Sequence, residues 1–129
     1  MELDKRVGDY TSAIVRDADS LLTDTSNLND EQREFARELQ QSAVRFQSIY
    51  NEHLKDFAEL THESIIAVHD LRNPLGLIVG YCELLLTREP DNLSQSQLQL
   101  LQQMKDAYTF IRHTFTLWAN EGIENTHNG

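Results

Sequence analysis

The chain has 129 residues, of which 40% are hydrophobic and 25% charged, a composition typical of one small globular domain or of two helical units that share a core. Acidic residues outnumber basic ones by 21 to 11, so the net charge of −10 gives no electrostatic basis for binding nucleic acid or an anionic membrane surface. Two prolines and five glycines are too few for a turn-rich β fold, and an all-α domain is favoured.

The location of the protein is constrained by three features of the sequence. The single cysteine, Cys82, excludes an intrachain disulfide and lies on an apolar stripe, where a small buried thiol is the ordinary interpretation. No apolar run approaches the about 20 residues that cross a bilayer, and the acidic start at residues 1–4 is unlike a signal peptide. We therefore expect a cytoplasmic protein that does not bind membranes.

The first predicted helix spans residues 3–22, where apolar side chains recur every three or four residues. A polar stretch, residues 23–29, then predicts a loop, and Asn29 with Gln32 three positions later has the pattern of a capping box that begins the next helix. The same pattern recurs at Ser94 and Gln97, after a second predicted loop at residues 87–94.

Between the two loops, the apolar stripe continues in steps of three and four, and neither Gly nor Pro interrupts residues 29–73. The simplest prediction is one long central helix of about 60 residues, about 85 Å in length. Such a helix cannot bury its stripe alone, so we expect antiparallel helical hairpins that form a four-helix bundle through homodimerisation.

An alternative is left open by a weak internal repeat. Ile14-Val15 precedes Ile78-Val79 by 64 positions, and the segments around the two loops are similar. A break in the central helix near residues 52–63 would then let both hairpins fold into a four-helix bundle within one chain. Under the offset of 64, Lys5 takes the place of His69 and Tyr10 that of Pro74, so the first hairpin carries no second copy of the histidine site described below.

The last predicted helix runs from Ser94 until Gly122 ends it. The expected organisation is an N-terminal hairpin with the start of the central helix (1–59), a second hairpin (60–121) and a flexible tail (122–129). The second hairpin contains the residues of greatest chemical interest.

One helical face of that hairpin is polar or small, because His69, Arg72, Asn73, Gly76 and Gly80 follow one another at helical spacing. His69 lies beside the apolar stripe and is expected to face outward. An imidazole has an ordinary pKa of about 6.5, so at neutral pH a ring nitrogen has a lone pair available to attack phosphorus. The glycines cost about 1 kcal/mol each in a helix interior, and they leave room for a docking protein.

Pro74 adds a larger penalty of about 3 kcal/mol, because it cannot donate a hydrogen bond to the carbonyl of Asp70. A bend just after His69 is therefore expected. Unfavourable residues gathered around one histidine indicate that function overrides stability there.

The segment from His69 to Leu75 (His-Asp-Leu-Arg-Asn-Pro-Leu) resembles the phosphoacceptor box of the dimerisation and histidine phosphotransfer domain of sensor histidine kinases. The likeness extends over about residues 60–120. It implies that His69 is phosphorylated, that Asp70 polarises its imidazole or acts as a base, and that Asn73 positions water during dephosphorylation of a partner. Arg72, Pro74, Gly76 and Gly80 would belong to the surface that docks the partner.

The resemblance also implies the partners. A receiver domain of a response regulator would exchange phosphate with His69, and Mg²⁺ would come from that partner or from a kinase, since we expect no cofactor or metal bound by this chain. His62 and His69 are about 10 Å apart along a helix, too far to share a metal. No ATP-binding domain fits after the last helix, so the chain is expected to depend on a histidine kinase in trans and not to be a self-sufficient kinase.

Two alternatives stay open at this point. The chain could be a non-catalytic dimeric adaptor that binds a receiver or a kinase without accepting phosphate, or a fragment of a longer sensor kinase. Phosphotransfer requires an accessible His69, whereas an adaptor permits a buried one.

Overall fold

The computed structural model describes the backbone of residues 1–88 and 90–128, and the side chains of residues 1–88 and 91–121. It contains four α-helices: α1 (Arg6–Leu21), α2 (Asp30–Glu52), α3 (His62–Thr87) and α4 (Gln95–Asn128). Two short 3-10 helices, η1 (Asp56–Ala58) and η2 (Pro90–Asn92), lie between them. The described residues form no strand, which confirms the all-α prediction.

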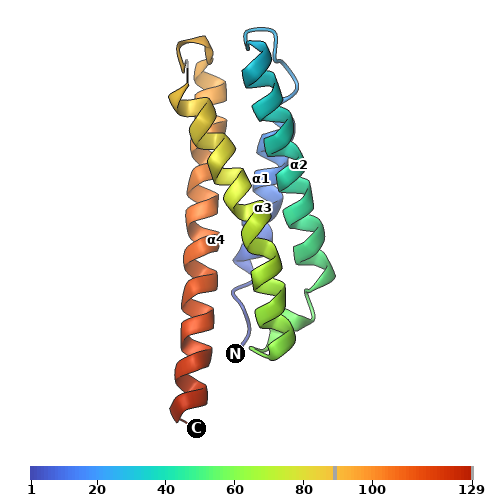
Figure 1. The fold of residues 1–129 in the computed structure, drawn as a ribbon, viewed down its shortest axis with the longest axis vertical. Helices are drawn as coiled ribbons and strands as arrows, with labels where there is room; N and C mark the ends of the chain where they lie inside the picture. The colour runs from blue at the N-terminus through green and yellow to red at the C-terminus, as the bar shows by residue number, and fades with distance from the viewer. Residues whose placement is uncertain (89, 129) are drawn as a thin grey trace.

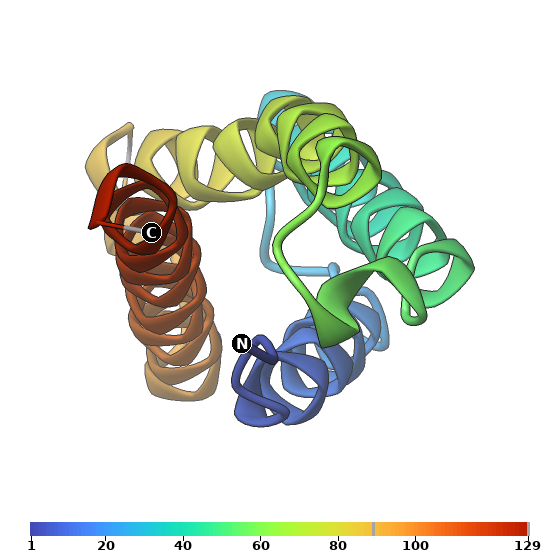
Figure 2. The ribbon, with the colours of Figure 1, turned by 90° about the horizontal axis from the view of Figure 1, so that it is seen from below.

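The helices alternate in direction and form a four-helix bundle (Figure 1). α1 packs against α2 and α4, and α3 packs against the same two helices. The view along the bundle places α1 opposite α3 and α2 opposite α4 (Figure 2). The predicted antiparallel hairpins and four-helix bundle are thus confirmed, and the four helices of one chain are sufficient to complete the bundle.

The predicted uninterrupted central helix is wrong, because α2 ends at Glu52 and α3 begins at His62. Thr61 and Ser64 form a capping box: the Ser64 N–H donates to Thr61 Oγ1 at 3.2 Å, and the Thr61 N–H donates to Ser64 Oγ at 2.7 Å. These bonds satisfy backbone donors at a helix start, so a new helix begins there although neither Gly nor Pro precedes it.

The connection between α2 and α3 is held by contacts of its own. Phe57 is 3% exposed and stacks on Tyr50 with ring centroids 5.4 Å apart, while its carbonyl accepts a hydrogen bond of 2.9 Å from the Leu3 N–H. His53 Nδ1 lies 2.8 Å from Asp56 Oδ2. Burial of an aromatic side chain stabilises the turn. The physical argument for a homodimer, an unpaired stripe on a 60-residue helix, therefore no longer applies.

The predicted end of the last helix at Gly122 is also wrong, since α4 continues to Asn128. A glycine in a helix interior costs about 1 kcal/mol, which weakens a helix but does not terminate it without the left-handed C-terminal geometry. Most of the segment assigned to a tail is helical, and residue 129 lies outside the described residues.

Candidate phosphoacceptor site

The site lies on α3, whose orientation is fixed by its buried side. The capping box sets the start of the helix, and apolar or small side chains then recur on the face that packs against α2 and α4. The buried residues of α3 are Ser64, Ala67, Val68, Leu71, Pro74, Leu75, Ile78, Cys82 and Leu85. This stripe leaves the opposite face of α3 in solvent.

His69 and Asp70 are both exposed. Within the part of the chain that the structure describes, neither side chain has a hydrogen bond or an ion pair to another residue. Both ring nitrogens of His69 are thus open to an incoming group. The predicted exposure of His69, on which a phosphoacceptor role depends, agrees with the structure.

His69 borders a hollow of about 320 Å³ between α3 and the C-terminal part of α4. Its other lining residues are Leu60, Ile65, Ile66, Val68, Arg72 and Ala119. Ile65 and Ile66 are 51% and 46% exposed, so an apolar rim lies about one turn before the histidine. The sequence analysis did not single out this rim. Two adjacent isoleucines outside the buried stripe were the available signal, because exposed large apolar side chains often mark interaction sites.

Pro74 lies inside α3, which remains helical on both sides of it. The helix changes direction near its middle, and the two views agree on this bend (Figures 1 and 2). The missing N–H of proline and the bulk of its ring account for such a bend. Pro74 is buried, unlike the rest of the predicted docking face, so it influences that face through the shape of the helix.

The remaining residues of the predicted docking face, Arg72, Asn73, Gly76 and Gly80, lie together along α3. The first three are exposed and Gly80 is half-buried. A Cβ atom added to Gly76 or to Gly80 would meet nothing within 4 Å. Close packing within the chain therefore does not require either glycine, although each destabilises the helix by about 1 kcal/mol relative to alanine.

Among the described side chains, residues 1–88 and 91–121, no three His, Cys, Asp or Glu side chains gather in an arrangement that could bind a metal ion. Across the same residues, no helix combines the length and the apolar character needed to span a membrane.

The comparison with protein families assigns this segment. Residues 66–109, about a third of the chain, match the His Kinase A (phospho-acceptor) domain family. The match begins in the first turns of α3, includes His69 and the loop after it, and ends in α4. No curated protein and no solved structure matches the chain. Residues 66–109 are therefore similar to a phosphoacceptor domain of the histidine kinase type, which confirms the resemblance drawn from the residues.

The match to this segment supports a phosphotransfer role of the two-component type. It does not include α1 and α2, so the first hairpin is assigned by the structure alone.

Proposed function

We propose that His69 accepts a phosphoryl group and exchanges it with the aspartate of a receiver domain. The observation that carries this proposal is an exposed histidine without intrachain partners, beside a helix face whose two glycines have no packing role within the chain. The two glycines destabilise the helix, and packing within the chain does not explain them. This combination points to a partner that approaches this face closely.

The transfer requires little chemistry from this chain. A ring nitrogen of His69 attacks the phosphorus of the receiver's aspartyl phosphate with its lone pair, and an N–P bond forms as the P–O bond to the aspartate breaks. The carboxylate leaves with the electron pair of that bond. The imidazole proton, made more acidic by the new bond, is held or accepted by the Asp70 carboxylate, and the reverse sequence returns the phosphoryl group to a receiver.

Alignment and charge neutralisation dominate phosphoryl transfer, so the receiver would also supply Mg²⁺ and its own acidic residues. Asn73, one turn after His69, would position a water molecule when a partner is dephosphorylated. A histidine kinase acting in trans could phosphorylate His69 by the same attack on a γ-phosphoryl group, with a nucleoside diphosphate as the leaving group.

Partner docking would use two adjoining surfaces of α3. Arg72, Asn73, Gly76 and Gly80 form the docking face beyond His69, and the rim of Ile65 and Ile66 lies before it. Apolar contacts on one side and a close backbone approach on the other would position a receiver with its aspartate above the imidazole.

The test compares His69→Gln with a matched exposed histidine on the same helix, His62→Gln. Both variants should keep the helical circular dichroism of the parent. With phosphoramidate as the donor, the parent and His62→Gln should acquire acid-labile, alkali-stable phosphate, and His69→Gln should acquire none. Equal incorporation by the His69 variant would refute the proposal.

The adaptor alternative predicts a different result in the same experiment. An adaptor would bind a receiver equally well before and after the His69→Gln substitution and would incorporate no phosphate in either form. The exposure of His69 favours the relay, because an adaptor has no requirement for an accessible imidazole.

A further inference from the structure

The two hairpins are related by more than a common architecture. Buried positions of α1 and α3 correspond at a constant offset of 64 residues. The corresponding buried pairs are Val7 and Leu71, Thr11 and Leu75, Ile14 and Ile78, Ala18 and Cys82, and Leu21 and Leu85. Each helix therefore presents the same register to the shared core.

Helices α2 and α4 correspond in the same way at an offset of 65, so the segment from Leu85 to Gln97 is one residue longer than the equivalent segment from Leu21 to Gln32. The corresponding buried pairs are Gln32 and Gln97, Ala36 and Leu101, Leu39 and Met104, Ser42 and Ala107, Phe46 and Ile111, and Tyr50 and Phe115. An approximate two-fold axis along the bundle therefore exchanges the two hairpins.

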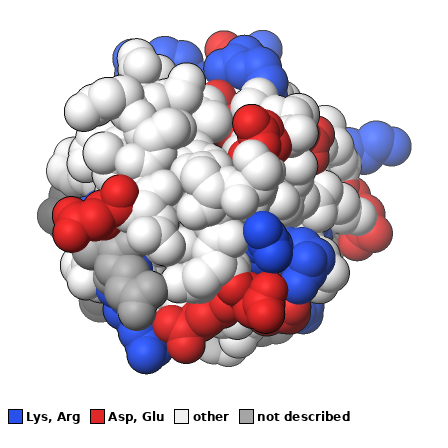
Figure 3. Space-filling model, turned by 90° about the horizontal axis from the view of Figure 1, so that it is seen from above, with Lys and Arg blue, Asp and Glu red and all other residues white. Residues whose placement is uncertain are grey.

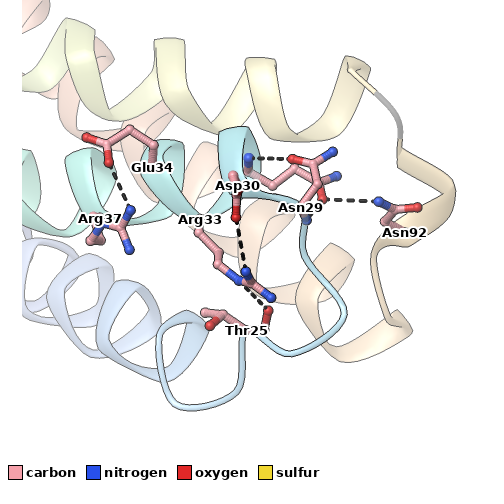
Figure 4. Close-up of polar contacts among 8 residues, drawn as sticks. Thr25, Asn29, Asp30, Arg33, Glu34, Arg37 and Asn92 are labelled. Atoms are coloured by element: carbon pink, nitrogen blue, oxygen red, sulfur yellow. Dashed lines mark hydrogen bonds and ion pairs between the residues drawn. The ribbon is translucent and has the colours of Figure 1, made fainter.

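Hydrogen bonds between the loops follow the same two-fold relation. Asn27 Nδ2 in the first loop donates to Gln97 Oε1 at 2.6 Å, and Asn92 Nδ2 in the second loop donates to Gln32 Oε1 at 3.3 Å. Each asparagine thus reaches the capping glutamine of the other hairpin. Figure 4 shows Asn92 directed from its loop toward the first turn of α2.

The loop end of the bundle carries few charges near its centre, which agrees with contacts between the neutral amide side chains of Asn and Gln. Seen from the loop end, the centre of the bundle is mainly uncharged, with Lys, Arg, Asp and Glu nearer the rim (Figure 3). Gln32 and Gln97 are only 2% and 6% exposed. Such isologous contacts, in which the same residues face each other across a two-fold axis, are characteristic of an interface between identical subunits.

The equivalence ends at the phosphoacceptor face. At the offset of 64, His69 corresponds to Lys5, the N-cap of α1, and Asp70 corresponds to Arg6, which is held by Asp4 with Nη2 2.6 Å from Oδ2. The counterpart of Pro74 is Tyr10, whose ring lies 4.3 Å from that of Phe110.

The α1 positions equivalent to the docking glycines are not glycines. Gly76 and Gly80 correspond to Ser12 and Arg16, both exposed. The α1 side of the bundle therefore has neither the nucleophile nor the open backbone of the α3 side.

We propose that the N-terminal hairpin takes the place of the second subunit, so that the chain acts as a monomer with one phosphate acceptor and one docking site for a single receiver domain. The monomeric state rests on the fold alone, whereas the one-to-one binding of a receiver rests on the proposed function. A receiver on the α1 side would meet Arg16 where the α3 side presents Gly80.

The apolar stripes of both hairpins are already buried against each other in one core. A second copy of the chain, or the helical hairpin of a kinase, could enter the bundle only by displacing the N-terminal hairpin. Because that hairpin is covalently attached, its effective concentration is in the millimolar range. The hairpin therefore competes strongly with any free partner for its place in the bundle. A kinase must therefore reach His69 from the exposed face.

The first experiment measures the mass of the full chain by light scattering and by sedimentation, from low to high micromolar concentration. A single species of 14.9 kDa at every concentration is expected. A second, differently tagged copy should not copurify with it after mixing. A species of twice this mass, or exchange between tagged copies, would overturn the monomeric bundle whatever the outcome at His69.

The second experiment counts sites. Saturation with phosphoramidate should give one phosphate per chain, and titration with a receiver domain should give one receiver per chain. Gly80→Arg should reduce receiver binding at least tenfold, and the matched change on the other side, Arg16→Gly, should leave both counts at one. Two receivers per chain would overturn the single docking site, whereas no phosphate on a monomer would refute the proposed function and leave the monomeric bundle standing.

Discussion

Replacing both glycines of the docking face by alanine should stabilise the protein and impair its exchange of phosphate. A Cβ at either position meets open space, so no packing penalty offsets the gain in helix propensity. Each substitution should add about 1 kcal/mol to the free energy of unfolding, and the pair about 2 kcal/mol. For a domain of this size, that corresponds to a rise in Tm of about 8 °C.

The same substitutions should slow phosphate exchange with a receiver about tenfold, because two added methyl groups hold the partner away from the helix backbone. Thermal and urea unfolding, followed by circular dichroism, give the first quantity, and phosphate exchange with a receiver domain gives the second. Ser12→Ala, the equivalent change on α1, is the control: it should gain at most about 0.5 kcal/mol, because it also removes the 3.4 Å hydrogen bond from Gln47 Nε2 to Ser12 Oγ, and it should leave exchange unaltered. Destabilisation by the glycine substitutions, or stabilisation with unchanged exchange, would refute the explanation of these glycines.

Three further predictions concern the core. Ile14→Ala and Ile78→Ala, at equivalent buried positions, should each lower the free energy of unfolding by about 3 kcal/mol in urea titrations. Burial raises the pKa of the Cys82 thiol to about 12, so alkylating reagents at pH 8 should label Cys82 only after unfolding. Burial also raises the pKa of the Asp17 carboxyl, against a smaller lowering by Arg16, so Asp17→Asn should increase stability at neutral pH.

The pH dependence of the last prediction has a definite sign. The Asp17 pKa is higher in the folded state than in the unfolded state, so the protonated carboxyl favours folding and this contribution is lost as pH rises through the folded pKa. The advantage of the asparagine variant should therefore disappear below the ordinary carboxyl pKa of about 4. An advantage that persists at low pH would show that burial of the charge is not its cause. For the isoleucine pair, costs that differ by more than about 2 kcal/mol would contradict the equivalence of the hairpins.

The exposed polar face of α3 was predictable because helical spacing alone defines it, whereas its phosphoacceptor role is implied by the family resemblance. His69, Arg72, Asn73, Gly76 and Gly80 recur along one side of a helix, and local periodicity determines which side faces the solvent. The two loops were predictable for a similar reason, since each is followed by a capping box with a glutamine at its third helical position.

The break between α2 and α3 was harder to predict, because the residues there also fit a helix. Phe57 occurs at a position that continues the apolar stripe, yet in the structure it fills the core from a 3-10 turn. Thr61 with Ser64 is a capping box in which serine replaces the more familiar glutamine or glutamate. Whether a helix continues or turns back at such a point depends on long-range burial, which local patterns do not contain.

The bend at Pro74 was predictable from the proline, but its burial depends on the packing of α3 in the bundle. The exposed rim of Ile65 and Ile66 was missed for the opposite reason, because apolar residues are usually assigned to the core. Both cases require knowledge of the neighbouring helices.

The covalent link through η1 affects how the sequences of the two halves of the bundle can diverge. In a homodimer every substitution appears twice, so a residue that helps a functional face also alters the same position on the other subunit. Here the two halves are encoded separately. The bend and the open backbone occur on α3 alone, while α1 keeps ordinary helix-forming residues at the equivalent places. One half can therefore contribute stability while the other retains unfavourable residues such as Pro74, Gly76 and Gly80.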